Sequence, residues 1–202
     1  MLDLNFSKLN LPKLLMPKLC VGSLHQVDPL HLKSKGLRAA MLDLDNTMLP
    51  WNTYGLSDEV LEWVDKMRSH DINVCLCSNA LPKRIEKALL PLALPYVAMA
   101  QKPLLRGFLR GLRLLGALPH ECAMIGDQIF TDVLGANRLG MYSIYIQQED
   151  LVEQRWMKGV RKLERWILRR NPRPLDVQRE LSSLTPLQAL PEVPSEFNES
   201  EN

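Results

Sequence analysis

The stretch Met41–Pro50, MLDLDNTMLP, decides how this sequence folds. It begins within an apolar run and then places two aspartates, Asp43 and Asp45, on either side of one leucine. Side chains two residues apart in a strand point to the same face, so we expect the two carboxylates to lie side by side at the end of a buried strand. Two like charges this close cost free energy unless something compensates them. A bound cation is the usual compensation, so the pair predicts a cation site at this strand end.

Strand-like and helical segments alternate along the chain on the C-terminal side of this stretch. Strands are predicted at residues 37–42, 72–77, 96–100, 122–125 and 142–146, and helices at 58–69, 82–90, 104–115 and 131–139. Ser57 and Pro82 are typical of helix starts, and Gly116 and Gly140 are typical of helix ends. Such alternation indicates an α/β fold with a doubly wound parallel sheet. In such sheets, binding sites lie beyond the carboxyl ends of the strands.

The composition is that of an ordinary soluble globular domain. Of the 202 residues, 46% are hydrophobic and 24% are charged, and the net charge of +2 favours no class of charged partner. The four cysteines are too few for a disulfide scaffold, and the C-x-C at Cys75 and Cys77 does not have the spacing of a zinc site. We therefore expect reduced thiols and a cytoplasmic location. We find no apolar run near the roughly 20 residues needed to span a membrane, and no secretory pattern.

The two ends of the chain differ from its central part, which spans residues 37–149. Residues 1–36 are predicted to be an irregular N-terminal extension, partly packed or membrane-facing, because Pro12 and Pro17 limit any helix there to short pieces. Residues 171–202 are rich in proline and acidic residues and poor in aromatic residues. We expect this last segment to be a disordered tail.

Residues 150–170 are predicted to form a basic amphipathic helix. Apolar residues recur there at helical spacing, and basic residues occupy the remaining faces. The apolar stripe consists of Val152, Trp156, Val160, Leu163 and Ile167, and the basic residues are Arg155, Lys158, Arg161, Lys162, Arg165, Arg169 and Arg170. Two interpretations stay open at this point. Either the stripe packs on the sheet and the basic face is solvated, or the helix lies on a membrane surface.

Polar residues follow each of the first four predicted strands. The four sets are D-x-D-x-T at residues 43–47, Ser78-Asn79, Lys102 before Pro103, and Gly126-Asp127 with Asp132 five residues later. Because the strand ends share one edge of the sheet, we expect these carboxylates, the hydroxyl and the ammonium group to converge. Oxygen ligands suit Mg²⁺, a carboxylate can attack phosphorus, and phosphoryl transfer needs mainly positioning and charge neutralisation. The set therefore predicts Mg²⁺-dependent phosphoryl chemistry.

This ordered set of motifs closely resembles the phosphatases of the haloacid dehalogenase superfamily. The resemblance is closer still to the subclass IIIA bacterial phosphatases related to mitochondrial phosphatidylglycerophosphate phosphatase. It rests on LDLDNTMLPW, SNA, QKP and GDQIFTDVLGANRLGMYSI, covers roughly residues 15–146, and is most specific in the last of these blocks. Ala80 and Pro50 depart from the pattern expected of close relatives, and both bear on the pocket wall and the substrate more than on the chemistry.

The resemblance implies a role for each residue of the first motif. Asp43 would attack the phosphate and form an aspartyl-phosphate. Asp45 would protonate the leaving alkoxide and then deprotonate the water that hydrolyses the intermediate. Thr47 would help to orient the loop.

The later motifs would bind the phosphate and the metal ion. The resemblance implies that Ser78, the backbone N–H of Asn79, and Lys102 surround the phosphate, with Lys102 balancing the charge of Asp43. The implied Mg²⁺ ligands are the side chains of Asp43 and Asp127 and the backbone carbonyl of Asp45, with Asp132 as a direct or water-mediated ligand.

The spacing between the motifs leaves no room for the cap domain that many relatives carry. Residues 47–78 hold only a loop, one helix and one strand, and residues 78–102 hold one helix and a short strand. The site should therefore be open to large substrates. The resemblance implies a phospholipid headgroup, with dephosphorylation of phosphatidylglycerophosphate to phosphatidylglycerol. The basic amphipathic helix favours peripheral attachment to a membrane surface.

Two alternatives are kept beside this hypothesis. The first retains the chemistry and changes the substrate to a soluble phosphomonoester, such as a sugar phosphate, a nucleotide or a nucleic-acid end. The second is a non-catalytic membrane-docking or scaffold protein on the same fold, which would need a broken motif. We expect no binding to nucleic acid through the basic helix, because too few aromatic residues accompany it for base stacking.

Overall fold

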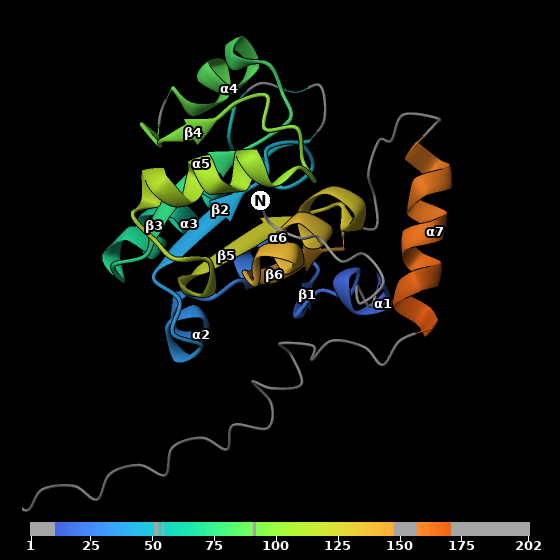
Figure 1. Cartoon of the computed structure of the whole chain (residues 1–202). Helices are drawn as coiled ribbons and strands as arrows, with labels where there is room; N and C mark the ends of the chain where they lie inside the picture. The colour runs from blue at the N-terminus through green and yellow to red at the C-terminus, as the bar shows by residue number, and fades with distance from the viewer. Residues whose placement is uncertain (1–10, 51–52, 54, 91, 148–156, 171–202) are drawn as a thin grey trace, which may run out of the picture.

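A computed structural model describes residues 11–50, 53, 55–90, 92–147 and 157–170. Its centre is a parallel sheet in the order β1-β6-β5-β2-β3-β4, with β2, the strand that leads into Asp43, among the inner strands (Figure 1). The strands are β1 (Leu19–Val21), β2 (Ala39–Leu42), β3 (Asn73–Cys77), β4 (Tyr96–Val97), β5 (Cys122–Gly126) and β6 (Tyr142–Ile146). The doubly wound parallel sheet is confirmed, and the predicted strand at 96–100 is shorter than expected.

The four helices predicted between residues 58 and 139 are present, and further helices lie near both ends of the described chain. They are α1 (Leu11–Leu14), α2 (Pro29–Ser34), α3 (Asp58–Ser69), α4 (Pro82–Leu89), α5 (Leu105–Leu115), α6 (Leu134–Leu139) and α7 (Met157–Arg170), with short helical turns η2 (Leu24–Gln26), η3 (Pro119–Glu121) and η4 (Ile129–Val133). Gly116 and Gly140 end α5 and α6 with φ angles of 60° and 77°, the left-handed conformation that glycine adopts without strain. The predicted helix at 131–139 begins earlier, as η4, and continues as α6.

Alternate residues of β2 face opposite layers of helices. Leu42 belongs to the larger core cluster together with Trp63 of α3, whereas Met41 belongs to a second cluster with Phe108 of α5. All four residues of β2 are buried. Burial on both faces is the reason that a strand of a doubly wound sheet has a continuous apolar sequence without alternation.

The N-terminal segment is not irregular, which corrects the sequence expectation for its described part. Strand β1 extends the sheet by pairing with β6, with Leu19 opposite Ile144. Helix α2 follows, and the Asp28 carboxylate caps it by accepting hydrogen bonds from the N–H groups of Leu30 and His31. A three-residue edge strand is too short to show a hydrophobic period, so no sequence pattern predicted β1.

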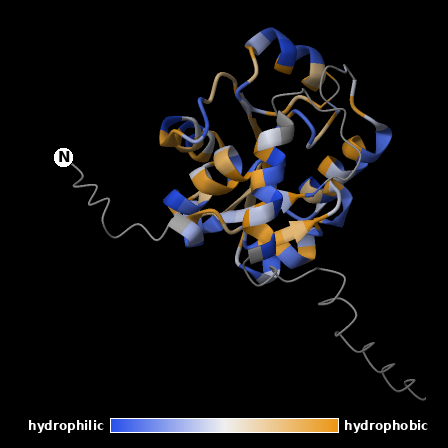
Figure 2. Cartoon of the chain, turned by 90° about the vertical axis from the view of Figure 1, so that its right-hand side faces the viewer, coloured by the Kyte–Doolittle hydropathy of each residue, from blue (hydrophilic) through white to orange (hydrophobic). Residues whose placement is uncertain are grey.

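Helix α7 lies at one side of the molecule, close to α1 (Figure 1), and its inner face differs from the predicted one. Arg161, Glu164 and Ile167 are buried, whereas the side chains of Leu163 and Trp166 are about half exposed, at 48% and 50%. The interpretation in which the apolar stripe packs on the sheet and the basic face is solvated is therefore wrong for Leu163 and for Arg161. Figure 2 shows the side of the molecule that carries α7, along which hydrophilic and hydrophobic residues are mixed.

Two further expectations concern the remaining parts of the chain. Residues 150–156 of the predicted basic helix and the predicted disordered tail at 171–202 lie outside the described residues. Within the described residues, no helix combines the length and the apolar character needed to cross a membrane.

Candidate active site

The loop after β2 separates its two aspartates into a buried and a partly exposed position. The Asp43 N–H donates to the carbonyl of Ile125 on β5 at 2.9 Å, so Asp43 remains fixed to the sheet. Asn46 then turns the chain with a φ of 59°, which asparagine tolerates better than most residues, and its N–H donates to the carbonyl of Leu49 at 2.8 Å. The side chain of Asp43 is 7% exposed and that of Asp45 is 22% exposed.

Lys102 lies between two carboxylates at the bottom of the site. Its Nζ is 2.8 Å from Oδ1 of Asp43 and 2.6 Å from Oδ1 of Asp132, and its side chain is only 2% exposed. Burial alone would lower the pKa of Lys102, but the adjacent charges of Asp132 and Asp43 raise it above its ordinary value. The ammonium group is therefore charged at any physiological pH.

The loops after β3 and β4 are joined through the side chain of Asn79. Its Oδ1 accepts a hydrogen bond from the Lys102 N–H at 2.7 Å, and its Nδ2 donates to the Lys102 carbonyl at 3.2 Å. The Ala100 N–H also donates to the Ser78 carbonyl at 2.9 Å. These bonds fix the backbone of Lys102. Because they use the side chain of Asn79, the group that Asn79 can offer to a ligand is its backbone N–H.

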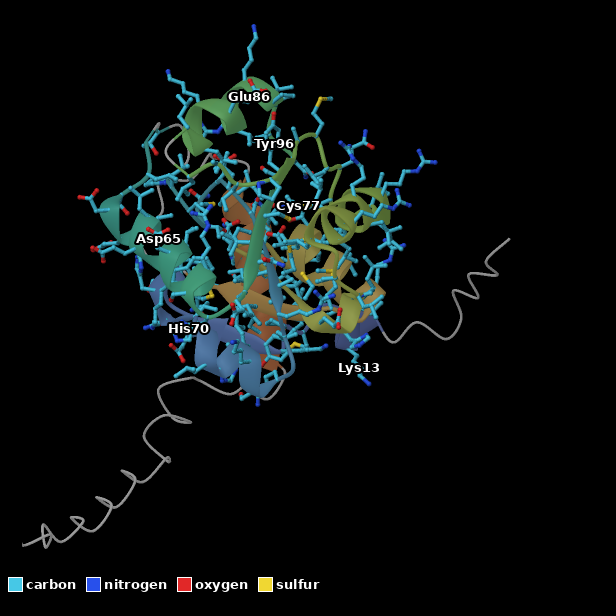
Figure 3. The ribbon with its side chains drawn as sticks, turned by 90° about the vertical axis from the view of Figure 1, so that its left-hand side faces the viewer. Lys13, Asp65, His70, Cys77, Glu86 and Tyr96 are labelled. Carbon is cyan, nitrogen blue, oxygen red and sulfur yellow. The ribbon has the colours of Figure 1, made fainter. Side chains whose placement is uncertain are left out.

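Ser78 is buried directly beyond Cys77, the last residue of β3, which Figure 3 labels in the interior of the molecule. The Ser78 Oγ accepts a hydrogen bond from the Ala80 N–H at 3.2 Å, and its own hydrogen remains available for donation to a ligand oxygen. Burial raises the pKa of the Cys77 thiol to about 11, so this neighbour stays protonated and does not add a charge to the site.

Gly126 allows the loop after β5 to fold back over the strand end. A Cβ atom at this position would overlap the Asp132 side chain, so any residue other than glycine would displace that side chain. The same Oδ2 accepts a hydrogen bond from the Gln128 N–H at 3.2 Å. The absence of a side chain at Gly126 therefore brings the Asp132 carboxylate next to Lys102.

Three buried carboxylates, those of Asp43, Asp127 and Asp132, place oxygens within 4.8 Å of one another and could hold a metal ion. Burial raises the pKa of Asp127 to about 6 and that of Asp132 to about 7, against the opposing charges of Arg161 and Lys102 respectively.

The charges buried in and around this site do not balance. Within the described residues, four carboxylates and two cations are buried, namely Asp43, Asp127, Asp132 and Glu164 with Lys102 and Arg161. When all four carboxylates are ionised, they exceed the two cations by two negative charges. This excess and the all-oxygen donor set fit a hard divalent cation such as Mg²⁺.

Comparison with known proteins assigns the chain to a family. Residues 9–140 match the family described as haloacid dehalogenase-like hydrolase. A curated relative, "Probable phosphatase YqeG" of Bacillus subtilis (strain 168), is 33% identical over 136 residues, which cover 67% of this chain and 79% of the relative. The chain belongs to the haloacid dehalogenase-like hydrolases. The family resemblance is thereby confirmed, and the narrower resemblance to subclass IIIA remains a prediction.

Two solved structures are similar at a lower level. One is an uncharacterized protein from Listeria monocytogenes serotype 4b, with a TM-score of 0.49 and 20% identity, covering 59% of this chain and 83% of that one. The other is 3-deoxy-D-manno-octulosonate 8-phosphate phosphatase from Moraxella catarrhalis, with a TM-score of 0.44 and 12% identity, covering 80% of this chain and 98% of that one.

The structure brings the predicted site residues of this hydrolase to one end of the sheet. Asp43, Lys102 and Asp132 are in direct contact, and Asp127 lies beside them. The remaining predicted residues, Asp45, Ser78, Asn79 and Thr47, lie in the loops that follow β2 and β3. Thr47 is buried, and its hydroxyl oxygen has no hydrogen-bond partner in the part of the chain that the structure describes. The structure does not test the role proposed for any of these residues.

Two residues of α7, beyond the part that matches the family, also reach the site. The Arg161 guanidinium donates to the carbonyl and to Oδ2 of Asp127, which leaves Oδ1 of Asp127 for a cation. Glu164 accepts from Arg161 at 3.1 Å and from the Ile129 N–H at 2.7 Å. The sequence analysis did not single out these two residues, and their spacing of three is compatible with an ion pair within one helix but contains no signal for contact with the site.

A third residue that the sequence analysis missed is Arg84. Its Nε donates to Oδ1 of Asp45 at 3.0 Å, and a second nitrogen of its guanidinium contacts the same oxygen. The sequence contains no signal for this pair, since the two residues are 39 positions apart.

Proposed function

We propose that this hydrolase is a Mg²⁺-dependent phosphatase that acts through Asp43 and dephosphorylates phosphatidylglycerophosphate to phosphatidylglycerol. The observation that carries the phosphatase assignment is the buried contact of Asp43 with Lys102, beside carboxylates that leave two negative charges uncompensated. A carboxylate fixed in this way is a nucleophile next to a place for a doubly charged cation and a phosphate. Family membership and the relative named as a probable phosphatase support the same assignment.

The proposed reaction has two steps, each with a displacement at phosphorus. In the first, an oxygen of Asp43 bonds to phosphorus, the bond from phosphorus to the leaving oxygen breaks, and Asp45 gives its proton to that oxygen. In the second, water attacks the phosphorus, Asp45 takes a proton from it, and the bond to Asp43 breaks to release phosphate. Lys102 stabilises the ionised Asp43 before the first step and again after the second.

The phosphate would be bound by the groups that surround Asp43. The Ser78 hydroxyl, the Asn79 N–H and the Lys102 ammonium are the donors for its oxygens. Mg²⁺ would be held by carboxylates of Asp43, Asp127 and Asp132 and by the Asp45 carbonyl, where it would neutralise charge on the phosphate.

The lipid substrate is proposed from the openness of the site and the outer face of α7. In the described residues, only α3 and β3 lie between the first and second motifs, and only α4 and β4 between the second and third. No cap domain is formed by these elements, so a headgroup in a bilayer can reach the site.

The outer face of α7 supports contact with an anionic membrane. A recess of about 460 Å³ on this face is lined by Gly159, Lys162, Leu163, Arg165, Trp166 and Arg169. Half-exposed leucine and tryptophan side chains flanked by three cations are typical of a helix that lies on an anionic lipid surface. Because Arg161 on the opposite face contacts Asp127, the same helix would bring the site close to that surface.

The alternative substrate is a soluble phosphomonoester. The buried groups of the site surround the phosphate and the cation, and none of them is specific for a lipid. A sugar phosphate, a nucleotide or a nucleic-acid end would undergo the same two steps.

Phosphate release from purified protein separates these substrates. We would compare phosphatidylglycerophosphate in mixed micelles with glycerol 3-phosphate, a hexose phosphate and a nucleotide, each with Mg²⁺ or EDTA, with Asp43→Asn as the control. We expect Mg²⁺-dependent release from the lipid, and loss of this activity in Asp43→Asn because the nucleophile is absent. Release from soluble esters alone would exclude the lipid and keep the mechanism, and activity retained by Asp43→Asn would exclude the mechanism.

Sedimentation with vesicles tests the membrane contact independently. We expect the Leu163→Ser/Trp166→Ser variant to lose at least about tenfold in affinity for phosphatidylglycerol vesicles at low salt, because both side chains bury apolar surface on binding. Leu109→Ser/Leu114→Ser on α5 is the matched control, since these leucines are also exposed, at 40% and 53%. Equal binding by wild type and the α7 variant would show that this face does not contact lipid.

A further inference from the structure

We propose that Arg84 is the positioning residue for Asp45, holding one carboxyl oxygen so that the other can pass a proton to the leaving group. This inference rests on the proposed mechanism, in which Asp45 is the acid and the base. Arg84 belongs to none of the four motifs from which the sequence analysis predicted the site.

Helix α4 provides a fixed base from which Arg84 reaches the loop after β2. Ile85, Ala88 and Leu89 bury one face of the helix in the core. On another face, the Tyr96 hydroxyl of β4 donates to Glu86 at 2.8 Å, and Figure 3 labels both residues near the top of the molecule. Arg84, two residues before Glu86, therefore extends from a helix whose inner face is buried in the core and which makes one side-chain hydrogen bond to β4.

The contacts of Arg84 concentrate on one atom of Asp45. Two nitrogens of the guanidinium contact Oδ1, with the Nε at 3.0 Å. A third, Nη1, donates to the carbonyl of Thr53 at 3.2 Å and so attaches the chain beyond the loop to the same side chain. Because both contacts to Asp45 are made by the planar guanidinium on Oδ1, they define the orientation of the carboxyl group and leave Oδ2 as the oxygen that carries a proton.

This arrangement is compatible with both protonation states that the mechanism requires. A protonated Asp45 accepts from Arg84 on Oδ1 while the hydrogen on Oδ2 faces the leaving oxygen. An ionised Asp45 keeps the same contacts as an ion pair while Oδ2 accepts a proton from water. The guanidinium stays charged throughout and does not act as an acid itself.

The exposure of the pair fits a position at the leaving-group side of the site. The side chains of Arg84 and Asp45 are 19% and 22% exposed, whereas those of Asp43, Lys102 and Asp132 are 7% exposed or less. In the proposed mechanism the phosphate would bind at the buried end, so the group that departs would lie toward the exposed end. Without Arg84, the carboxyl group of Asp45 could rotate about its Cβ–Cγ bond, whose torsion angle is only weakly restricted. The acidic hydrogen would then face the leaving oxygen in a smaller fraction of the bound complexes.

Leaving-group dependence distinguishes positioning from a structural role. The test compares kcat/KM for an alkyl phosphate with that for p-nitrophenyl phosphate, whose leaving group departs without a proton. The alkyl phosphate is glycerol 3-phosphate or, where the wild type does not hydrolyse it, phosphatidylglycerophosphate in mixed micelles. The value of kcat/KM depends only on the steps up to departure of the leaving group. The later action of Asp45 as a base therefore does not affect it. We expect Arg84→Gln to lower kcat/KM for the alkyl phosphate by about 30- to 100-fold, since general acids contribute at least about 100-fold, and for p-nitrophenyl phosphate by less than about threefold.

Three further variants complete the experiment. Arg84→Lys should recover only part of the loss, because an ammonium group lacks the planar fork. Asp45→Asn should show the same dependence on the leaving group, and adding Arg84→Gln to it should cost less than about twofold more. Lys83→Gln removes a charge from an exposed neighbouring position of α4 and should change neither substrate by more than about twofold.

Several results would overturn the proposal. They are equal losses for the two esters in Arg84→Gln, no loss for either, or independent losses in the double variant. A wild type that hydrolyses the soluble esters but not phosphatidylglycerophosphate would exclude the lipid assignment and leave the Arg84 comparison intact. A wild type inactive on every ester would remove the reaction in which Asp45 acts, and would exclude both proposals.

Discussion

The carboxyl ends of the strands, here called the sheet edge, carry Asp43, and helix α7 carries Arg161. The two regions meet at Asp127, but they are held in place by different forces. Strands β2, β3 and β5 pair along their lengths, and every residue of β2 and β5 is buried. Of the described residues of α7, only Ile167 joins the core fully as an apolar side chain, and the other two buried residues are charged. The edge is therefore stabilised mainly by apolar burial, and α7 is located mainly by ion pairing.

This difference indicates how specific each attachment is. The free energy of apolar burial depends on the buried area and changes little when side chains reorient slightly. A buried ion pair is favourable only over a small range of distances and angles, because both charges lose their hydration. The position of α7 should therefore depend on a few atoms, and that of the sheet edge on many. Removing one partner from each region is the direct way to examine this contrast.

The largest effect is expected for Arg161→Gln on α7. The change leaves the Asp127 and Glu164 carboxylates buried without their common partner, which typically costs about 3 to 5 kcal/mol. Because α7 can undock, we expect faster hydrogen exchange in α7 than in the sheet, measured by mass spectrometry. Arg165→Gln, at an exposed position of the same helix, should change stability by less than about 0.5 kcal/mol. Equal exchange in the two variants would contradict ionic docking.

A smaller effect is expected when a methyl group is added to a glycine in each region. Gly126→Ala should lower the free energy of unfolding by about 1 to 3 kcal/mol, as overpacking does, and should abolish phosphatase activity by displacing Asp132. Gly159→Ala on α7 has no heavy atom within 4 Å of the new Cβ and should stabilise the helix by up to about 1 kcal/mol. Urea unfolding of the two variants measures this difference, and destabilisation by both would show that α7 is packed as tightly as the sheet edge.

The last effect concerns pH in the absence of metal, where stability depends on the protonation of the buried carboxylates. Because the pKa values of Asp127 and Asp132 are raised to about 6 and 7, the folded state holds more protons than the unfolded state between about pH 4 and pH 7. Stability without metal should therefore fall as pH rises through this window and level off above it. Added Mg²⁺ should raise Tm more at pH 8 than at pH 5, because it competes with protons for these carboxylates.

Thermal unfolding in EDTA and in MgCl₂ at several pH values measures this dependence. Asp132→Asn is the control, since removal of one titrating group should flatten the curve in EDTA. A metal-free protein that is more stable at pH 8 than at pH 5 would contradict the assignment of the buried carboxylates.

Most of the fold could be predicted because its signals are local. Helix α3 and strand β6 have the predicted bounds, and α5 and α6 end at the predicted glycines. The placement of polar residues after the strands also predicted which side chains of the site would gather at one edge. Strand β1 could not be predicted, because three residues that pair only at the edge of the sheet leave no pattern in the sequence.

The sequence by itself determined the strands and helices between residues 37 and 146 and the motifs that follow its strands, because periodicity and helix-end signals depend on neighbouring residues. The tertiary structure alone decided that Lys102 lies between Asp43 and Asp132, that Arg84 holds Asp45, and that α7 turns Arg161 inward to Asp127. Each of these contacts joins residues about 30 or more positions apart. Their charges are compensated only when the folded chain removes them from water together, and no local pattern records which partners will meet.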